Sequence, residues 1–242
     1  MDIQDSRKIK RGMTRYLILV VDASIAMHDK DFEPSRLKTS EEILSDFITE
    51  YFDQNPISHL SIIITKEGLA EKLTELSGNP KHHVQSLQDA LDKGRGMASF
   101  QNALELAYKT LMFAILTKKV HLFFTQSSYR NIPKFGTREV LLVTGSISTC
   151  DPGDINETID KLKNNKIRTS VISLSSEVYI CKRIAEHTKG KFFVPLSKHN
   201  FRQMLFTFIQ PPPECFEQKE VTLINMGFPQ YSREQNFSIC VW

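Results

Sequence analysis

The chain has 242 residues, of which 40% are hydrophobic and 24% charged, and its formal net charge is +3. This composition is ordinary for a globular protein with a sizeable core, and the basic excess is too thinly spread for a dedicated nucleic-acid binder. A polar N-terminus, and the lack of any apolar run near the roughly 20 residues that span a bilayer, predict neither a signal peptide nor a membrane segment.

Strands and helices are predicted to alternate along the chain. Continuous apolar, β-branched runs are typical of strands buried on both faces, and they occur at 16–21, 60–65, 139–144 and 167–174. Residues 69–76 and 191–194 predict two weaker strands. Apolar side chains at helical spacing predict helices over 34–54, 84–94, 99–112, 151–162, 177–189 and 198–209.

Three of these helices have local start signals. Pro34 is expected in the first turn of its helix, where the missing N–H is not needed. Ser99 is expected to cap the helix that follows it. Asp151 and Pro152 together predict an N-cap followed by proline at the first helical position.

The alternation predicts an α/β fold with a doubly wound, mostly parallel six-stranded sheet flanked by helices, over residues 13–210. In such sheets ligands bind beyond the carboxyl ends of the strands. We therefore expect Asp22, Ser24, the Ser99 loop and the loop 146–151 to lie near one another.

The remaining segments fit this domain poorly. Residues 1–12 are expected to form a flexible N-terminal arm, and 117–135 to be an unusual insertion between a helix and a strand. Residues 211–242 begin with three prolines, which predict a stiff linker leading into a short tail. The tail carries one apolar cluster, which is too small for a core of its own.

The polar residues after the first strand resemble half of the metal site of von Willebrand A domains. That site has Asp-x-Ser-x-Ser in the first loop, a Ser or Thr in the second and an Asp in the third. Here Asp22 and Ser24 are followed by Ala26, Ser99 serves the second loop, and Gly145 stands where the third loop needs a carboxylate. Because Mg²⁺ needs an octahedral shell of oxygens, we expect no metal at this degenerate site.

Other candidate chemistry is weak. No Walker A loop is present, and the glycines at 94 and 96 follow a helix, where a dinucleotide fingerprint follows a strand. His82 and His83 are expected to be solvated, and Cys181 to be a packed thiol although Lys182 and Arg183 beside it would favour the thiolate. None of the four cysteines lies in a C-x-x-C pair, so zinc-site spacing is lacking.

Several sequence runs resemble one family more closely. These runs are 51–58 (YFDQNPIS), 73–80 (LTELSGNP), 138–141 (REVL) and 226–230 (MGFPQ). They are similar to the larger von Willebrand A subunit, of the Ssl-one type, of the general transcription and DNA-repair factor TFIIH.

The resemblance implies a nuclear, non-catalytic TFIIH subunit that binds and stimulates the XPD-type helicase in transcription initiation and nucleotide excision repair. It implies contact with other core subunits, only indirect contact with DNA, and no membrane or small-molecule substrate. The candidate partner-binding edge comprises Ser146, Ser148, Thr149 and Asp151. The family continues into cysteine-rich zinc modules that have no counterpart in this sequence, so no cofactor is expected.

Two alternatives remain open at this point. The segment 31–37, with Asp31, Phe32, Pro34, Arg36 and Leu37, also resembles the A-domain ubiquitin receptor of the proteasome, another protein-binding module. A metal-dependent adhesion domain is the second alternative, and it predicts stabilisation by Mg²⁺.

Overall fold

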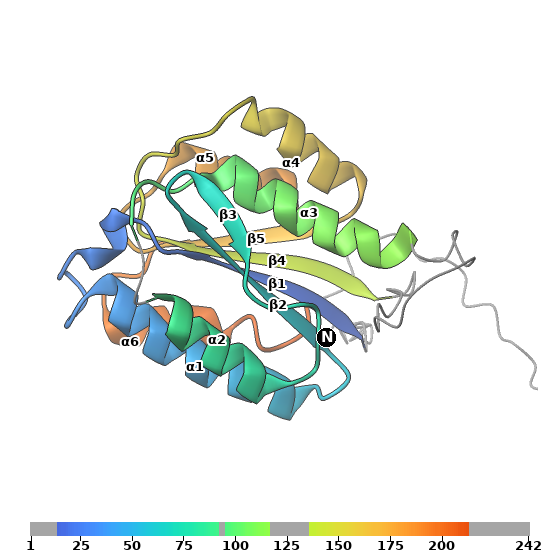
Figure 1. Ribbon diagram of the computed structural model, residues 1–242, viewed down its shortest axis with the longest axis horizontal. Helices are drawn as coiled ribbons and strands as arrows, with labels where there is room; N and C mark the ends of the chain where they lie inside the picture. The colour runs from blue at the N-terminus through green and yellow to red at the C-terminus, as the bar shows by residue number, and fades with distance from the viewer. Residues whose placement is uncertain (1–13, 92–94, 117–135, 213–242) are drawn as a thin grey trace, which may run out of the picture.

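A computed structural model describes residues 14–91, 95–116 and 136–212 of the chain. They form a six-stranded sheet with the strand order β3-β2-β1-β4-β5-β6, covered by helices on both faces (Figure 1). The strands are parallel except for β3, which runs antiparallel to β2 at one edge. The predicted doubly wound, mostly parallel α/β fold is therefore confirmed.

The central strands are β1 (Arg15–Asp22), β2 (His59–Lys66), β4 (Thr137–Thr144) and β5 (Arg168–Ser173). The short strands β3 (Leu69–Lys72) and β6 (Phe192–Phe193) close the two edges. Every residue of β1 is buried, because both of its faces are covered by helices. Its last residue, Asp22, lies in register with Thr65, so the polar ends of neighbouring strands are level.

The helices form two layers, each with its own apolar core (Figure 1). One layer contains α1 (Arg36–Gln54), α2 (Pro80–Leu91) and α6 (Lys198–Phe206). The other contains α3 (Phe100–Leu116), α4 (Ile155–Asn164) and α5 (Tyr179–His187). Alternate residues of β1 point into the two cores: Leu17 and Leu19 lie in the first, Ile18 and Val20 in the second.

Two expected helix starts are wrong. Pro34 precedes α1, because the hydroxyl of Ser35 accepts a hydrogen bond from the N–H of Lys38 and so sets the cap one residue later. Asp151 does not cap α4, whose N-cap is Asp154. The carboxylate of Asp151 instead accepts a hydrogen bond from the N–H of Gln101, in the first turn of α3, at 2.9 Å. Ser99 caps α3 as expected, accepting from the N–H of Asn102.

The strand predicted over 69–76 ends early, at Lys72. The N–H groups of Leu73 and Thr74 both donate to the carbonyl of Ile62, so one residue of β2 faces two of its neighbour. The chain then makes a single bridge between Ser77 and Leu60. The arm 1–12, the insertion 117–135 and the tail beyond Pro212 lie outside the described residues. None of the described helices is long and apolar enough to cross a membrane.

The two adjacent histidines differ from expectation and from each other. His82 is exposed, but His83 is fully buried against the stacked ring of Phe52, so its predicted solvation is wrong. Its Nδ1 lies 2.8 Å from the hydroxyl of Thr74, and its Nε2 lies 3.0 Å from that of Ser77. Both ring nitrogens thus have hydrogen-bond partners, and these bonds join the start of α2 to the segment that follows β3.

This burial predicts an acid-sensitive stability. Desolvation lowers the pKa of His83 from 6.5 to about 4, so between these values the unfolded chain binds more protons than the folded one. The free energy of unfolding is therefore unaffected by His83 protonation well above pH 6.5, and it decreases as the pH falls from 6.5 towards 4. We expect a loss on the order of 1 kcal/mol between pH 7.5 and pH 5.5 from this group alone. Urea unfolding of wild type and His83→Gln should show it as an extra slope in wild type; parallel pH profiles would contradict it.

A buried ion pair lies at the opposite, amino edge of the sheet. The Arg15 side chain is 1% exposed and pairs with Glu139 through Nη2 and Oε2 at 2.7 Å and through Nε and Oε1 at 3.0 Å. Its Nη1 and Nη2 also donate to the carbonyls of Ile209 and Phe208, just after α6. The guanidinium lies 4.8 Å from the ring centroid of Tyr51. This arginine thereby joins two central strands to α1 and to the end of the last helix.

Candidate functional site at the carboxyl edge of the sheet

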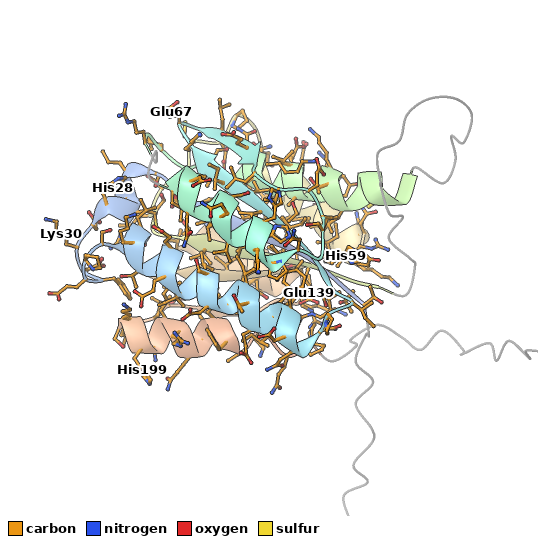
Figure 2. The ribbon with its side chains drawn as sticks, turned by 60° about the horizontal axis from the view of Figure 1, so that its bottom comes forward. His28, Lys30, His59, Glu67, Glu139 and His199 are labelled. Atoms are coloured by element: carbon orange, nitrogen blue, oxygen red, sulfur yellow. The ribbon has the colours of Figure 1, made fainter. Side chains whose placement is uncertain are left out.

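The loops that follow β1, β2 and β4 meet the segment 95–99, which joins α2 to α3, at the carboxyl edge of the sheet. Backbone hydrogen bonds join Ile25 N–H to the carbonyl of Gly96 at 2.9 Å, and Gly68 N–H to that of Met97 at 2.7 Å. Another joins Cys150 N–H to the carbonyl of Ala98. Figure 2 shows His28, Lys30 and Glu67 at this edge, far from His59 and Glu139 at the other. The expected convergence of Asp22, Ser24, the Ser99 loop and the loop 146–151 is confirmed.

Asp22 is the centre of this edge and is fully buried. Its Oδ1 accepts a hydrogen bond from the N–H of Ser24 at 2.8 Å. Its Oδ2 accepts from the hydroxyls of Thr144 at 2.8 Å and Ser146 at 2.7 Å, and from the N–H groups of Gly145 and Ser146 at 3.2 and 3.1 Å. A single carboxylate thus organises the end of β4 against the end of β1, through neutral donors only.

The hydroxyls near Asp22 are also committed to protein partners. The hydroxyl of Ser24 lies 2.8 Å from that of Ser146, which itself donates to Asp22, so Ser24 is the donor in this contact. The hydroxyl of Ser99 donates to Asp151 Oδ1 at 2.9 Å, and that of Thr149 donates to the same oxygen at 2.8 Å. The hydroxyls of Ser146, Ser99 and Thr149 therefore bind the carboxylates of Asp22 and Asp151, and that of Ser24 binds Ser146.

These residues do not fit a divalent cation. A hard cation needs oxygens with free lone pairs, but Oδ2 of Asp22 already accepts four hydrogen bonds, which leaves only Oδ1, with one, to contribute. Ala26 and Gly145 supply no side-chain oxygen, and Asp151 is turned towards the start of α3. The described residues contain no group of three or more His, Cys, Asp or Glu side chains arranged to hold a metal.

The predicted partner-binding residues differ in what they present to solvent. Ser146 is buried on Asp22, and Thr149 accepts from the N–H of Phe100 as well as donating to Asp151. Ser148 is exposed. The sequence reasoning overlooked Ile147, which lies between them and is 68% exposed. Its apolar character in a polar loop was the available signal.

Ile147 belongs to a wider set of exposed apolar side chains at this edge, which we call the apolar rim: Ile25, Leu69, Met97 and Ile147. The backbone contacts described above place their loops against one another. Tyr179 and Leu196, after β5 and β6, extend the same edge. Within the described ranges, Ile57 is the large exposed hydrophobic residue that lies elsewhere, at the start of β2. Exposed apolar side chains gathered in this way are typical of protein-binding surfaces.

Cys181 is a packed residue, as expected. It is fully buried in α5, and burial, with the negative charge of Asp22 adding to it, raises the pKa of its thiol to about 12. Lys182 and Arg183 therefore do not make it a nucleophile, because the thiolate is scarcely populated at neutral pH.

Comparison with known proteins identifies the family. The sequence model of the family described as Ssl1-like matches residues 20–124 and 116–229. The chain belongs to the Ssl1-like family. This agrees with the resemblance carried by the sequence runs at 51–58, 73–80, 138–141 and 226–230.

Named relatives of this Ssl1-like chain are similar over nearly all of its length. General transcription factor IIH subunit 2 of Dictyostelium discoideum is 41% identical over 99% of this chain, and that of Arabidopsis thaliana is 39% identical over 96%. The general transcription and DNA repair factor IIH subunit ssl1 of Schizosaccharomyces pombe is 37% identical over 98%. The chain spans 48%, 51% and 53% of these relatives, about half of their length.

Solved structures support the fold assignment. The TFIIH p34 N-terminal domain has a TM-score of 0.62 at 12% identity, covering 80% of this Ssl1-like chain and 97% of that domain. The SpRpn10 VWA domain has a TM-score of 0.56 at 15% identity, covering 76% and 88% respectively. The Ssl1-like chain therefore has a von Willebrand A fold.

Proposed function

We propose that this chain is the von Willebrand A part of a non-catalytic TFIIH core subunit, which binds and stimulates the XPD-type helicase in transcription initiation and nucleotide excision repair. Family membership supports this role, since the named relatives are subunits of factor IIH. The helicase docks at the carboxyl edge, where the exposed Ser148 follows Ile147 of the apolar rim. The observation that carries the proposal is the gathering of exposed apolar side chains at this edge.

The composition of the apolar rim suits a protein partner. The side chains of Ile25 and Ile147 are 70% and 68% exposed. Their burial by a partner would remove apolar area from water, which is the main favourable term in association. The loops beneath them are held by the buried network around Asp22, so little conformational freedom is lost on binding. A preorganised apolar surface of this kind binds protein by shape and does not need a metal.

The same proposal assigns the chain its other properties. It is a nuclear protein that contacts further TFIIH core subunits, with DNA reached only indirectly and with no membrane or small-molecule substrate. It takes no zinc or other cofactor and has no catalytic activity of its own. The mild net charge of +3 supports the indirect relation to DNA. The likeness to the SpRpn10 VWA domain, at 15% identity, concerns the fold alone, so a ubiquitin-receptor role is not proposed.

The helicase role is tested with the full chain and a purified XPD-type helicase. We expect the two proteins to elute together from a gel-filtration column and the unwinding rate to rise when the chain is added. A chain that is folded by circular dichroism yet neither co-elutes nor raises the rate would reject the proposed role.

We further propose that the carboxyl edge works without a divalent cation, because protein donors already satisfy Asp22. A cation present at a free concentration 100 times its Kd would add about 2.7 kcal/mol to the free energy of unfolding. For a domain of this size, this raises the melting temperature by roughly 5–10 °C. We expect the melting temperature in millimolar Mg²⁺ and in EDTA to agree within about 1 °C. A rise of several degrees in Mg²⁺ that Asp22→Asn abolishes would show a working metal site.

A further inference from the structure

Arg36 makes a set of contacts that its position in the sequence does not suggest. It is the first residue of α1, yet its side chain is 9% exposed and turns back towards the loops of the carboxyl edge. Its Nε and Nη2 donate to the two carboxylate oxygens of Asp31 at 2.8 and 2.7 Å, and Nη1 lies 3.0 Å from Asp29 Oδ2. The Nη1 atom also donates to the backbone carbonyls of Ala26 at 3.0 Å and Gly145 at 3.1 Å.

The two carbonyls bound by Nη1 belong to Ala26 and Gly145. A metal-binding A domain has a metal-ligating side chain at each of these two positions, and this chain has no side-chain oxygen at either. Ala26 stands at the third ligand position of the first loop, and Gly145 at the carboxylate position of the third loop. A positively charged guanidinium thus bridges the first and third loops, which is the structural task of the cation in a metal site. It bridges them by binding backbone oxygens, so it does not need the missing side chains.

The packing around Gly145 shows that this arrangement fills the available space. A Cβ atom at residue 145 would lie 2.7 Å from Sδ of the buried Met27 and 3.3 Å from Cδ of Arg36. A carboxylate therefore cannot be placed at residue 145 unless Met27 moves. The loss of the metal ligand and the presence of the guanidinium are two parts of one packed arrangement.

We propose that Arg36 is a built-in cation that replaces the metal as the tie between the first and third loops of the carboxyl edge. Its guanidinium holds the loop 23–31 against the loop 145–150, and Asp31 and Asp29 balance its charge and fix its orientation. A planar group with five N–H donors suits this task, because Nε and Nη2 bind one carboxylate with two hydrogen bonds while Nη1, which has two N–H groups, reaches two carbonyls. Arg36 is therefore a positioning residue, and its role does not depend on which partner binds the edge.

The test is amide hydrogen exchange on the full chain, for wild type, Arg36→Ala and Arg36→Lys. We expect Arg36→Ala to raise exchange about tenfold or more in residues 145–150, and to leave the central strands β1 and β5 unchanged, because the loss is local. Arg36→Lys should restore little of the protection, since an ammonium group has no planar fork. Arg202→Ala is the matched control, because that arginine makes an exposed ion pair with Asp46 on α6 and α1.

A second arm uses ethylguanidinium chloride as the probe. At millimolar concentration it should restore protection of residues 145–150 in Arg36→Ala and have no effect on wild type or Arg202→Ala, because only the first has a vacant guanidinium site. Unchanged exchange in the loop of Arg36→Ala would overturn the proposal. Exchange raised equally in the loop and the central strands, with no effect of ethylguanidinium, would also overturn it, because Arg36 would then contribute only to global stability.

Discussion

Asp22→Ala should lower the free energy of unfolding by about 3–5 kcal/mol, because five buried hydrogen bonds lose their acceptor at once. Three donors are backbone N–H groups, of Ser24, Gly145 and Ser146, and two are hydroxyls, of Thr144 and Ser146. Each unsatisfied buried donor is destabilising by about 1–3 kcal/mol, and water entering the vacated space offsets part of the sum. Urea unfolding monitored by circular dichroism measures the loss.

Measuring Asp22→Ala with and without a divalent cation distinguishes a hydrogen-bonded Asp22 from a metal-binding one. We expect the loss in Asp22→Ala to be equal in EDTA and in Mg²⁺, because the carboxylate binds protein donors in both. Asp22→Asn should lose less, since its carbonyl oxygen still accepts while its amide opposes one donor. A destabilisation that appears only in the presence of Mg²⁺ would contradict the hydrogen-bonded network.

Arg15→Met should be comparably destabilising, by about 3–5 kcal/mol, at the opposite edge of the sheet. The substitution leaves the carboxylate of Glu139 buried, with the hydroxyl of Thr137 still donating to it at 2.9 Å, and the carbonyls of Phe208 and Ile209 lose their donor. An uncompensated buried charge is far less favourable than a neutral side chain at the same place. The free energy of unfolding in urea gives the value.

The double variant Arg15→Met/Glu139→Leu distinguishes a lost charge partner from lost packing. It should be more stable than Arg15→Met, because the isolated carboxylate is gone. The exposed pair of Arg202 and Asp46 provides a matched control, and Arg202→Ala should lose at most about 1 kcal/mol. A double variant less stable than Arg15→Met would contradict the explanation by charge.

Local sequence patterns predicted the helices and strands. Contacts between residues far apart in the sequence decided which partner each polar side chain binds, and these the sequence did not show. Buried β-branched runs located the central strands within a few residues, because a strand covered on both faces leaves a continuous apolar signal. Asp151 shows the limit. The pair Asp151–Pro152 has the local signature of an N-cap, but residues some 50 positions earlier, at the start of α3, bind the carboxylate. His83 had a usable signal, since 83, 87 and 91 share one helix face.

The candidate site was predictable in position and only partly in content. Parallel strand ends had to place Asp22 and Ser24 beside the loop after β4, and the gaps at Ala26 and Gly145 were visible in the sequence. Ser99 follows α2 and is held at this edge by Thr65 at the end of β2, whose hydroxyl accepts from its N–H at 2.9 Å. Arg36 was not predictable as a site residue, because a first-turn arginine ordinarily points to solvent. The apolar rim was only partly predictable: an isoleucine in a polar loop pointed to Ile147, but the sequence does not show which other apolar loop residues are exposed.

The most direct test of the central claim compares two isoleucines of similar exposure at opposite edges of the sheet. Ile147 in the apolar rim is 68% exposed and Ile57 is 63% exposed. The affinity for the XPD-type helicase is measured in EDTA for wild type, Ile147→Asp and Ile57→Asp, each checked for an unchanged melting temperature. A metal-free apolar docking edge predicts tight binding by wild type and Ile57→Asp, and affinity at least about tenfold weaker for Ile147→Asp. Wild-type binding that requires Mg²⁺, or equal affinities for the two variants, would contradict it.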